Sequence, residues 1–229
     1  KLLMDKINFI GLKSSTIIAT TNKKSDLKII NFCKMNNIKY FIGSNDNVLR
    51  RYYECSKKFK IKNIIRLTAD CPFLDISLLK RMISIYKKNR YDYLSNAYPL
   101  PCTFPDGSDI EIFSFNTLEE SHLNARLPSE KEHVTNYIYG KGHNNIKRID
   151  LKNDLSKYRY TIDNINDFKV FEEILKVFKY DEVIKLKYYQ IANFLKKNKK
   201  LILYQKKLQR NYGWKSSIEK DIKYLRTNS

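Results

Sequence analysis

Cysteine, proline, glycine and tryptophan are scarce in this chain of 229 residues. It contains four cysteines, five prolines, six glycines and one tryptophan. The cysteines have neither the paired spacing of a zinc site nor the density of a secreted, disulfide-built domain. Its apolar stretches are far shorter than the ~20 residues that a membrane span needs. These shortages exclude a disulfide scaffold and a membrane protein, and they predict a cytoplasmic protein in a reducing setting.

Acidic residues are few relative to basic ones. The chain has 44 Lys and Arg against 24 Asp and Glu, a formal net charge of +20, although 42% apolar residues exclude a disordered chain. Residues 176–229 hold 15 basic and 4 acidic residues, a net charge of +11. This excess is typical of a solvated surface or of a protein that binds anions. A nucleic-acid-binding module is therefore one alternative, and it predicts steep salt dependence carried by residues 186–226.

Apolar periodicity predicts an α/β fold. The pattern indicates helices at 2–12, 45–59, 76–86, 116–125, 130–139 and 164–177. It indicates strands at 15–20, 39–42, 63–68, 91–95 and 158–162, and an edge or hairpin strand at 110–115. Such alternation favours a mostly parallel sheet flanked by helices. We expect one α/β domain over 1–180 and a basic, mainly helical extension over 181–229.

Two acids follow predicted strands. Asp70 comes after the strand at 63–68, and Asp163 comes after the strand at 158–162. Ligands of an open parallel sheet bind beyond the carboxyl ends of its strands, so these carboxylates are expected to lie close together. Mg²⁺ prefers one or two carboxylates, with water and substrate phosphate completing its shell. The alternative for either acid alone is a helix N-cap.

Other polar side chains lie near the same strand ends. Arg50, Arg66 and Arg159 are suited to binding phosphate or carboxylate, because the guanidinium group bonds in a bidentate manner, and surface ion pairing is their alternative role. His133 is predicted near the start of a helix, between Glu132 and Val134. It is either a hydrogen-bonded structural residue or a residue that faces the substrate.

Six motifs in unbroken order carry a family resemblance. They are Gly43-Ser-Asn-Asp-Asn-Val-Leu-Arg-Arg-Tyr-Tyr53, Arg66-Leu-Thr-Ala-Asp-Cys-Pro-Phe-Leu-Asp75, Asp92-Tyr-Leu-Ser-Asn96, Phe104-Pro-Asp-Gly-Ser-Asp-Ile-Glu-Ile-Phe113, Glu132-His-Val-Thr135, and Arg159-Tyr-Thr-Ile-Asp163 with Asp167. Over roughly residues 1–180 the chain resembles the SpsF-type spore coat polysaccharide biosynthesis proteins. These are part of the cytidylyltransferase family that includes acylneuraminate and 3-deoxy-manno-octulosonate cytidylyltransferases.

The resemblance implies a Rossmann-like, nucleotide-diphospho-sugar transferase fold and a reaction of CTP with an acidic sugar. The products would be a CMP-sugar and pyrophosphate. By resemblance, Asp70 and Asp163 hold Mg²⁺ and act in catalysis with Arg66. The nucleotide side would comprise Thr20, Thr21, Ser44, Arg50, Thr68 and Ala69. The acceptor side would comprise Asn96, Asp106, Asp109, Glu111, His133 and Arg159. A homodimer is also expected by resemblance.

One departure from the family concerns its first strand and the Gly- and Lys-containing loop that wraps the triphosphate. Neither is found before the helix predicted at 2–12. Such a loop supplies backbone N–H groups and cations to phosphates, so we expect a truncated form with impaired activity. A sugar-nucleotide glycosyltransferase of similar fold is a second alternative. Its usual Asp-x-Asp metal motif does not match Thr-Ala-Asp-Cys-Pro at 68–72.

Overall fold

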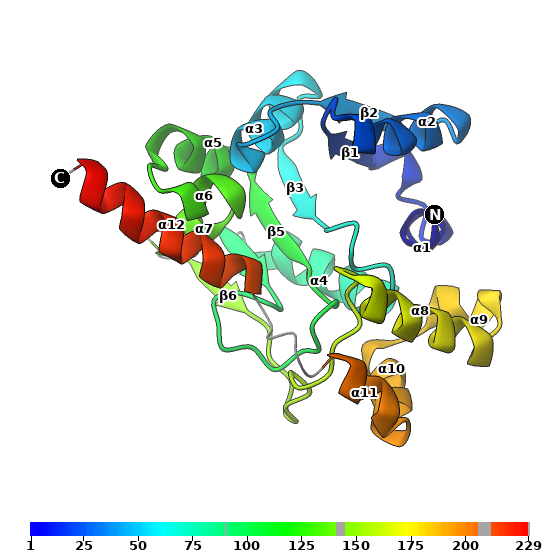
Figure 1. Cartoon of the computed structure of the whole chain (residues 1–229). Coiled ribbons are helices and arrows are strands. Elements are labelled where there is room, and N and C mark those ends of the chain that lie inside the picture. Colours follow the sequence, from blue (N-terminus) through cyan, green and yellow to red (C-terminus); the bar gives the residue numbers. More distant parts are fainter. Residues whose placement is uncertain (90, 141–144, 206–211, 229) are drawn as a thin grey trace. The chain divides into compact units, whose positions relative to one another are not determined.

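The computed structural model describes residues 1–89, 91–140, 145–205 and 212–228 (Figure 1). The chain divides into two compact units. Unit 1 comprises Lys1–Gly11, Ile65–Ile112 and Ile146–Arg210, and unit 2 comprises Leu12–Ile64, Phe113–Asn145 and Asn211–Ser229.

Helices alternate with short strands along the chain. The strands are β1 (Ile17–Thr20), β2 (Lys39–Ile42), β3 (Asn63–Arg66), β4 (Tyr93–Ser95), β5 (Glu111–Ser114) and β6 (Ile146–Arg148). The α-helices are α1 (Leu2–Phe9), α2 (Leu27–Met35), α3 (Val48–Lys58), α4 (Ile76–Asn89), α5 (Phe115–Asn124), α6 (Pro128–Glu132), α7 (Asn136–Gly140), α8 (Ile165–Val177), α9 (Tyr180–Lys185), α10 (Tyr188–Lys197), α11 (Lys199–Gln205) and α12 (Tyr212–Asn228). Within the described ranges, no helix is both long enough and apolar enough to cross a bilayer.

The α/β fold is confirmed, and its parallel sheet is small. β1 and β2 form a parallel pair, and a second sheet has the strand order β3-β5-β4-β6, in which β4 and β6 are parallel. Of the two alternatives for the strand at 110–115, the edge position is wrong, because β5 lies between β3 and β4, the strand that precedes it in the chain. The alternating pattern misled about the position of this strand, because the charged residue Glu111 is only 1% exposed and faces the interior.

In place of the strand predicted at 158–162, the structure has an isolated β-bridge. Arg159 pairs in parallel with Asp106, and the amide of Tyr160 donates to the carbonyl of Asp106 at 2.9 Å. Next to it, Gly107 has φ of 104°, and a Cβ there would lie 2.7 Å from the backbone nitrogen of Thr161. The chain therefore meets an irregular loop at this point and does not join the sheet.

The helix predicted at 130–139 is interrupted. Val134 has a positive φ of 60° and is fully buried, and it separates α6 from α7. A positive φ is costly for a β-branched residue and marks local strain. As a result His133 is the residue that ends α6, although the sequence pattern placed it near a helix start.

A hydrophobic core packs several helices of unit 1 together. Its buried members are Leu2, Phe73, Tyr158, Tyr160, Val170, Ile174, Val183, Ile184, Leu186, Ile191, Ala192, Leu195 and Leu201. α8, α9 and α10 all contribute to this core, so helices of the predicted α/β domain and of the predicted extension pack together in unit 1. Apolar burial of this kind is the main source of folding free energy.

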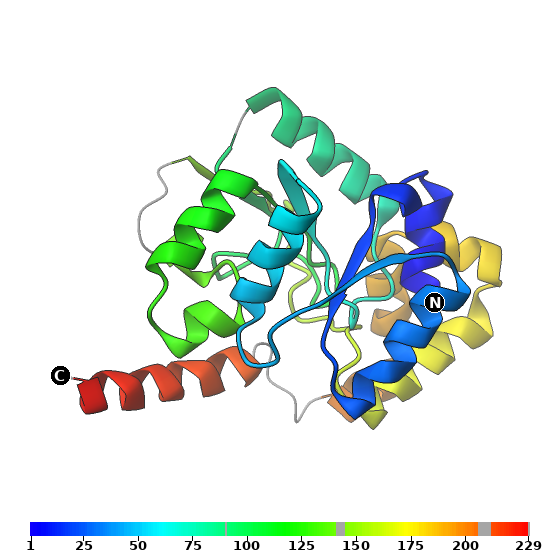
Figure 2. The same cartoon turned by 90° about the horizontal axis from the view of Figure 1, so that it is seen from above.

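Unit 2 combines the β1–β2 pair with several helices. α2 packs against both strands, and α3 contacts α5 and α6. α12 lies along α6, as Figures 1 and 2 both show. Side-chain caps define two helix starts, because Asn47 accepts from the amide of Arg50 and Ser114 accepts from the amide of Thr117.

A buried lysine joins two helices of unit 1. Lys6 on α1 is fully buried, and its Nζ donates to the carbonyl oxygens of Val183 at 2.5 Å and Ile184 at 3.0 Å, near the end of α9. Burial lowers the pKa of Lys6 to about 8, although the charge of Asp75 opposes this change. The ammonium group thus binds two carbonyls near the end of α9, and that of Val183 also accepts from the amide of Leu186 at 3.3 Å.

This lysine predicts an unusual dependence of stability on pH. Between pH 8 and 10.5 the unfolded chain holds a proton on Lys6 that the folded chain has lost, so the free energy of unfolding should rise with pH in this window. The contribution is at most about 3 kcal/mol. We expect Lys6→Met to lose this rise in urea unfolding measured from pH 7 to 10.5. An identical pH profile in both proteins would contradict the account.

Candidate functional site

The two acids singled out at strand ends lie in neighbouring segments of unit 1. The carbonyl of Asp70 accepts from the amide of Ile162 at 2.8 Å and from the hydroxyl of Thr161 at 3.2 Å. Asp163 is the next residue along the chain. The segment after β3 therefore meets the segment before α8, which is the juxtaposition that the sequence predicts for a magnesium site.

Asp70 has the features of a ligand-binding carboxylate. Its Oδ1 is buried and has no hydrogen-bond partner among the described residues. An unsatisfied buried oxygen costs free energy unless something binds it. In the part of the chain that the structure describes, no group of three or more His, Cys, Asp or Glu could hold a metal. A Mg²⁺ ion that took one or two carboxylates, with water and phosphate oxygens for the rest, fits these residues.

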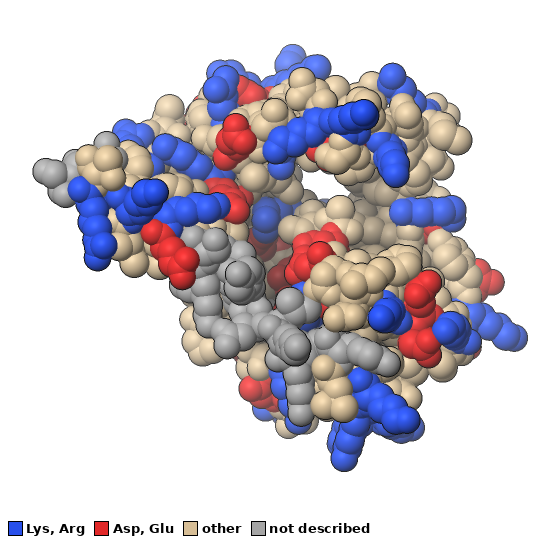
Figure 3. All heavy atoms as spheres, viewed as in Figure 1, with Lys and Arg blue, Asp and Glu red and all other residues tan. Residues whose placement is uncertain are grey.

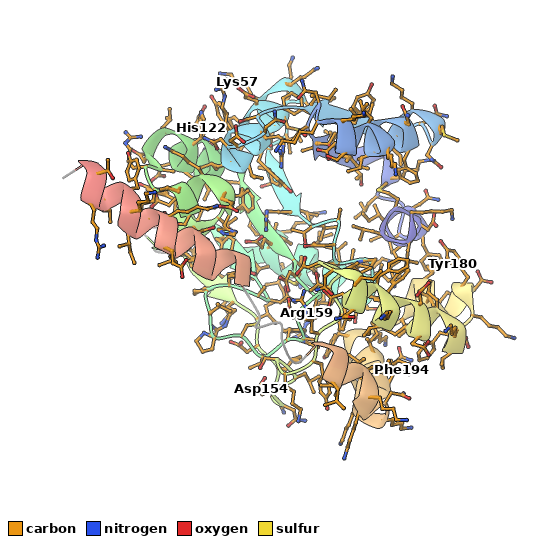
Figure 4. All side chains as sticks on the ribbon, in the orientation of Figure 1. Lys57, His122, Asp154, Arg159, Tyr180 and Phe194 are labelled. Carbon is orange, nitrogen blue, oxygen red and sulfur yellow. The ribbon has the colours of Figure 1, made fainter. Side chains whose placement is uncertain are left out.

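Arg159 gathers carboxylates from three segments (Figure 4). Its guanidinium is ion-paired with Asp106 on the irregular loop, with Asp163, and with Asp167 on α8 at 3.2 Å. Burial lowers the pKa of Arg159, but the hydrogen bonds and charges of these acids outweigh it and leave that pKa raised. The arginine expected to bind the acceptor is thus engaged with protein carboxylates.

Negative charge also concentrates around Cys71. Burial raises the pKa of the Cys71 thiol well above its usual value, and the charges of Asp109, Asp70 and Asp106 raise it further. The negative potential of these acids, which disfavours a thiolate, favours a cation bound at the same place. The acids predicted for the metal and for the acceptor therefore act on the same neighbourhood.

Asp167 makes more contacts at the candidate site than its place in the motif suggested. Its carboxylate is fully buried and accepts from the amide of Asp163 at 3.0 Å and from the side chain of Asn164 at 2.8 Å, besides pairing with Arg159. Its signal in the sequence is its spacing, because it comes three residues after the N-cap Asn164. Because first-turn acids commonly serve helix ends only, this spacing alone does not indicate a site residue.

Arg66 and Glu111 are paired with each other. Their ion pair joins β3 to β5, and the Glu111 carboxylate also accepts from the hydroxyl of Tyr93 at 2.6 Å. Glu111 is 1% exposed, whereas the Arg66 side chain is 15% exposed. The structure therefore places Glu111 inside the sheet, and of this pair only Arg66 keeps some access to solvent.

Asn96 links the end of β4 to the loop that precedes β5. Its Nδ2 donates to the carbonyl of Ser108 at 3.0 Å, and its Oδ1 accepts from the amide of Ile110 at 2.8 Å. The residue is fully buried. Asp109 lies between these two partners, so Asn96 holds the backbone that presents Asp109.

Some of the residues predicted to bind the nucleotide lie in unit 2. Thr20 and Thr21 end β1 and are buried, and the Thr21 hydroxyl donates to the Asp26 carboxylate at 2.5 Å. Hydrogen bonds from Thr21 and Ser25 lower the pKa of Asp26. The Thr20 hydroxyl makes a longer bond of 3.5 Å to the same carboxylate. In the described structure these threonines therefore bind the side chain of Asp26, the residue before α2.

The remaining nucleotide-side residues differ in their surroundings. The Ser44 hydroxyl accepts from the amide of Asn47 at 3.1 Å, before α3. Arg50 forms an exposed ion pair of 2.7 Å with Glu54, one turn along the same helix. Thr68 and Ala69 belong to unit 1, directly before Asp70.

His133 contacts the C-terminal helix. Its Nε2 lies 2.9 Å from the hydroxyl of Ser217 on α12, and that hydroxyl donates to Glu132 at 2.8 Å. Lys220 donates to the same Glu132 carboxylate at 3.1 Å. Of the two roles left open for His133, hydrogen bonding within the protein is directly visible.

A cavity of about 490 Å³ in unit 2 is lined by none of the predicted site residues. Its lining residues are Ser56, Lys57, Lys60, Ile61, Lys62, Ser114, Phe115 and Asn116. Lys57 is labelled in Figure 4. The cavity lies where the end of α3 meets the start of α5. It is therefore separate in sequence from every residue that the strand-end argument selected.

The expected basic footprint for nucleic acid is mixed with acids. On α12, Lys220 and Lys223 alternate with Glu219 and Asp221, and Figure 3 shows blue and red side chains interspersed on the face drawn. Residues 206–211 of the proposed basic segment lie outside the described residues. Alternating charge of this kind is typical of a solvated helix surface.

Comparison with known proteins defines the class of this protein. A family model described as "Cytidylyltransferase" matches residues 2–211, which is most of the chain. The chain belongs to this family, and its fold is that of a nucleotidyltransferase. The α/β architecture and the SpsF-type resemblance expected from the motifs are confirmed.

Individual relatives agree with this assignment. The chain is 33% identical over 202 residues to an uncharacterised protein of Methanocaldococcus jannaschii, covering 86% of this chain and 79% of that protein. It is 31% identical to the spore coat polysaccharide biosynthesis protein SpsF of Bacillus subtilis, covering 69% of this chain and 65% of SpsF. A solved cytidylyltransferase structure from Leptospira borgpetersenii matches with a TM-score of 0.78 and 30% identity, over 88% of this chain and 84% of that one.

The ion pairs predict a large difference between two arginine substitutions. Arg159→Met would leave the buried carboxylate of Asp167 without its cation, so we expect a loss of roughly 3–5 kcal/mol in unfolding free energy. Arg50→Met removes a matched but exposed pair and should cost less than about 1 kcal/mol. Urea unfolding at pH 7 measures both. Equal losses would contradict the structural role given to Arg159.

Proposed function

We propose that this protein is a CTP-dependent nucleotidyltransferase that makes a CMP-activated acidic sugar for surface polysaccharide. The observation that carries the proposal is the meeting of Asp70 with the segment of Asp163, with the Oδ1 of Asp70 buried and without a partner among the described residues. Membership of the cytidylyltransferase family supplies the nucleotide, and the relation to SpsF supplies the polysaccharide context.

Mg²⁺ is the metal that we propose for this site. Asp70 and Asp163 would hold it, since both are hard oxygen donors and the carboxylates near Cys71 already favour positive charge. When bound, the ion would supply Lewis-acid stabilisation of charge on the triphosphate. Asp70 is prepared for this role by its unpartnered Oδ1, whereas Asp163 would exchange part of its bond with Arg159.

The proposed reaction is an in-line displacement at the α-phosphorus. A hydroxyl oxygen of the acidic sugar forms the new bond to phosphorus, the bond from the α-phosphorus to the bridging oxygen of the β-phosphate breaks, and the hydroxyl proton leaves to a base or to water. Pyrophosphate carries away the bonding electrons. Catalysis of such transfers consists mostly of positioning and electrostatic stabilisation.

The described contacts suggest how this chain would position the reactants. Arg159 holds Asp106 and Asp163 in place, so the acids cannot drift apart by mutual repulsion. Asn96 similarly supports the backbone before Asp109. We propose that Thr20, Thr21, Ser44, Arg50, Thr68 and Ala69 face the nucleotide, with Arg66 close to the reacting phosphate. We propose that Asn96, Asp106, Asp109, Glu111, His133 and Arg159 serve the acceptor side.

A homodimer and a cytoplasmic location complete the proposal. The homodimer follows from the resemblance to SpsF-type cytidylyltransferases. The cytoplasmic location follows from the few cysteines of the chain, and a cytoplasmic enzyme would have access to CTP. Light scattering on the purified protein measures the first directly.

The proposed activity is tested by supplying the protein, expressed from its complete reading frame, with CTP and Mg²⁺. The acceptors would be N-acetylneuraminate and 3-deoxy-manno-octulosonate. We expect pyrophosphate release that requires both CTP and an acidic sugar, and a CMP-sugar identified by mass spectrometry. Transfer of sugar from a nucleotide-sugar donor, without pyrophosphate release from CTP, would contradict the proposal and favour a glycosyltransferase.

Asp70→Asn separates the metal role from a structural role. An amide of the same shape should not lower the unfolding free energy, because it replaces a buried oxygen that has no described partner. Turnover dependent on Mg²⁺ should be lost. Asp181→Asn, at an exposed acid of α9 in the same unit, is the matched control and should retain turnover. Turnover that survives in Asp70→Asn would remove this residue from the metal site.

A further inference from the structure

The cavity of unit 2 has a basic wall. Its volume is about 490 Å³, which is in the range of pockets that bind small organic ligands. The wall includes Lys57, Lys60 and Lys62, and the structure describes no acid among the lining residues. Every lining residue belongs to unit 2, so the cavity is defined within one compact unit. Because positive charges gathered around a concave surface attract anions, this wall favours an anionic ligand.

Two of the three lysines have no partner for their charge among the described residues. The Nζ atoms of Lys60 and Lys62 form no ion pair and no hydrogen bond with any described residue. Lys57 differs, because its Nζ donates to the hydroxyl of Tyr53 at 3.2 Å, and this bond raises the pKa of Lys57. The Tyr53 hydroxyl in turn donates to Glu119 at 3.2 Å. The charges of Lys60 and Lys62 are therefore available to a ligand.

A buried hydroxyl of the same wall is also available. Ser56 lies in the last turn of α3, is only 3% exposed and lines the cavity. Its carbonyl accepts from the amide of Ile61 at 2.9 Å, but its Oγ has no hydrogen bond to any residue in the described ranges. A hydroxyl both donates and accepts, so this oxygen suits a polar ligand atom in the cavity.

The backbone holds Lys60 in a conformation that is unfavourable for a lysine. α3 ends in a Schellman motif, in which the amide of Ile61 donates to Ser56 and the amide of Lys60 donates to the carbonyl of Lys57 at 3.2 Å. This motif requires left-handed backbone at Lys60, whose φ is 53°. Glycine is the usual residue at such a position, because it has no Cβ. The end of the helix therefore does not by itself account for a lysine here, whereas a charge needed in the cavity does.

The start of α5 adds backbone donors to the wall. The amide of Phe115 donates to the carbonyl of Lys62 at 2.8 Å, and the amide of Thr117 donates to the hydroxyl of Ser114 at 3.1 Å. Between them lies Asn116, which lines the cavity. Amides in the first turn have no acceptor within their own helix, and together with the helix dipole they attract anions. The first turn of α5 and the lysines thus favour the same kind of ligand.

The rest of the wall is apolar enough to hold an organic group. Ile61 and Phe115 line it, and the Phe115 ring stacks on Tyr53 with ring centroids 5.8 Å apart. An aromatic ring fixed in this way offers contact area to an aromatic or aliphatic body. A ligand that combines an anionic group with an apolar body would use both kinds of surface.

We infer that this cavity is a binding site for a phosphomonoester with an aromatic or apolar body. Its phosphate would lie among the three lysines, the Ser56 hydroxyl and the first turn of α5, and its body would contact Ile61 and Phe115. A phosphate is favoured over a carboxylate because it carries about two charges and has three acceptor oxygens for separate donors. The inference does not depend on the proposed function, since no residue proposed to bind the nucleotide or the acceptor lines the cavity.

Titration of the full chain with phenyl phosphate tests the site. At low ionic strength we expect saturable shifts of the amide signals of Ser56, Lys60 and Asn116 in nitrogen-15 NMR, and weaker binding as salt is added. Inorganic phosphate, which has no apolar body, and benzoate, which has a single charge, should both bind more weakly. Absence of saturable shifts with phenyl phosphate would overturn the inference. Equally tight binding of inorganic phosphate or of benzoate would overturn the ligand class.

Lys60→Gly separates binding of a ligand from folding. It removes the ammonium group and relieves the left-handed backbone, so the urea midpoint should rise. The affinity for phenyl phosphate should nevertheless fall roughly 3- to 10-fold. Asn37→Gly is the matched backbone control, because Asn37 has φ of 51° after α2, and Lys28→Gln is the matched charge control on α2. Both controls should keep the wild-type affinity, and an unchanged affinity in Lys60→Gly would overturn the inference.

Ser56→Ala tests the hydroxyl separately. Because this oxygen has no described partner, its removal should not lower the urea midpoint, whereas the affinity for phenyl phosphate should fall roughly 2- to 5-fold. A lower midpoint with unchanged affinity would overturn the place of Ser56 in the site. Turnover of CTP enters none of these measurements, so failure of this inference and failure of the proposed function are distinguishable.

Discussion

The ion pairs of Arg159 are the interaction on which the candidate site depends. One guanidinium neutralises carboxylates from the irregular loop, from the segment before α8 and from α8 itself. Without this cation, Asp106, Asp163 and Asp167 would repel one another, and the fully buried Asp167 would be an uncompensated charge. A backbone hydrogen bond of 2.8 Å from Ile162 to the carbonyl of Asp70 keeps the Asp163 segment beside Asp70. The stability of this part of unit 1 and the arrangement of the candidate site therefore depend on the same ion pairs.

Acids at this site serve two different physical purposes. Asp106 and Asp167 are satisfied by Arg159, so they stabilise the arrangement. Asp70 has an Oδ1 that no described group satisfies, so it carries a cost that a ligand would remove. The presence of both satisfied and unsatisfied carboxylates distinguishes a binding site from an ordinary ion-pair network.

Sequence reasoning predicted the α/β fold and the family, because apolar periodicity and motif order are local properties of a chain. It also predicted that the segments of Asp70 and Asp163 lie close together, as the hydrogen bond from Ile162 to Asp70 shows. It failed where tertiary contacts decide. Glu111 reads as a polar strand residue, yet it is buried by pairing with Arg66 and Tyr93. The break at Val134 is supported by α12, which lies some 80 residues away in sequence. Neither effect leaves a signal in the local pattern.

The central claim is that Asp70 and Asp163 form a metal site for a nucleoside triphosphate. A crystal structure with Mg²⁺ and a CTP analogue that cannot be cleaved between the α- and β-phosphates tests it most directly. The account predicts a metal about 2.1 Å from an oxygen of Asp70 and from an oxygen of Asp163, with phosphate oxygens in the same coordination shell. A bound triphosphate whose metal contacts neither carboxylate would contradict it.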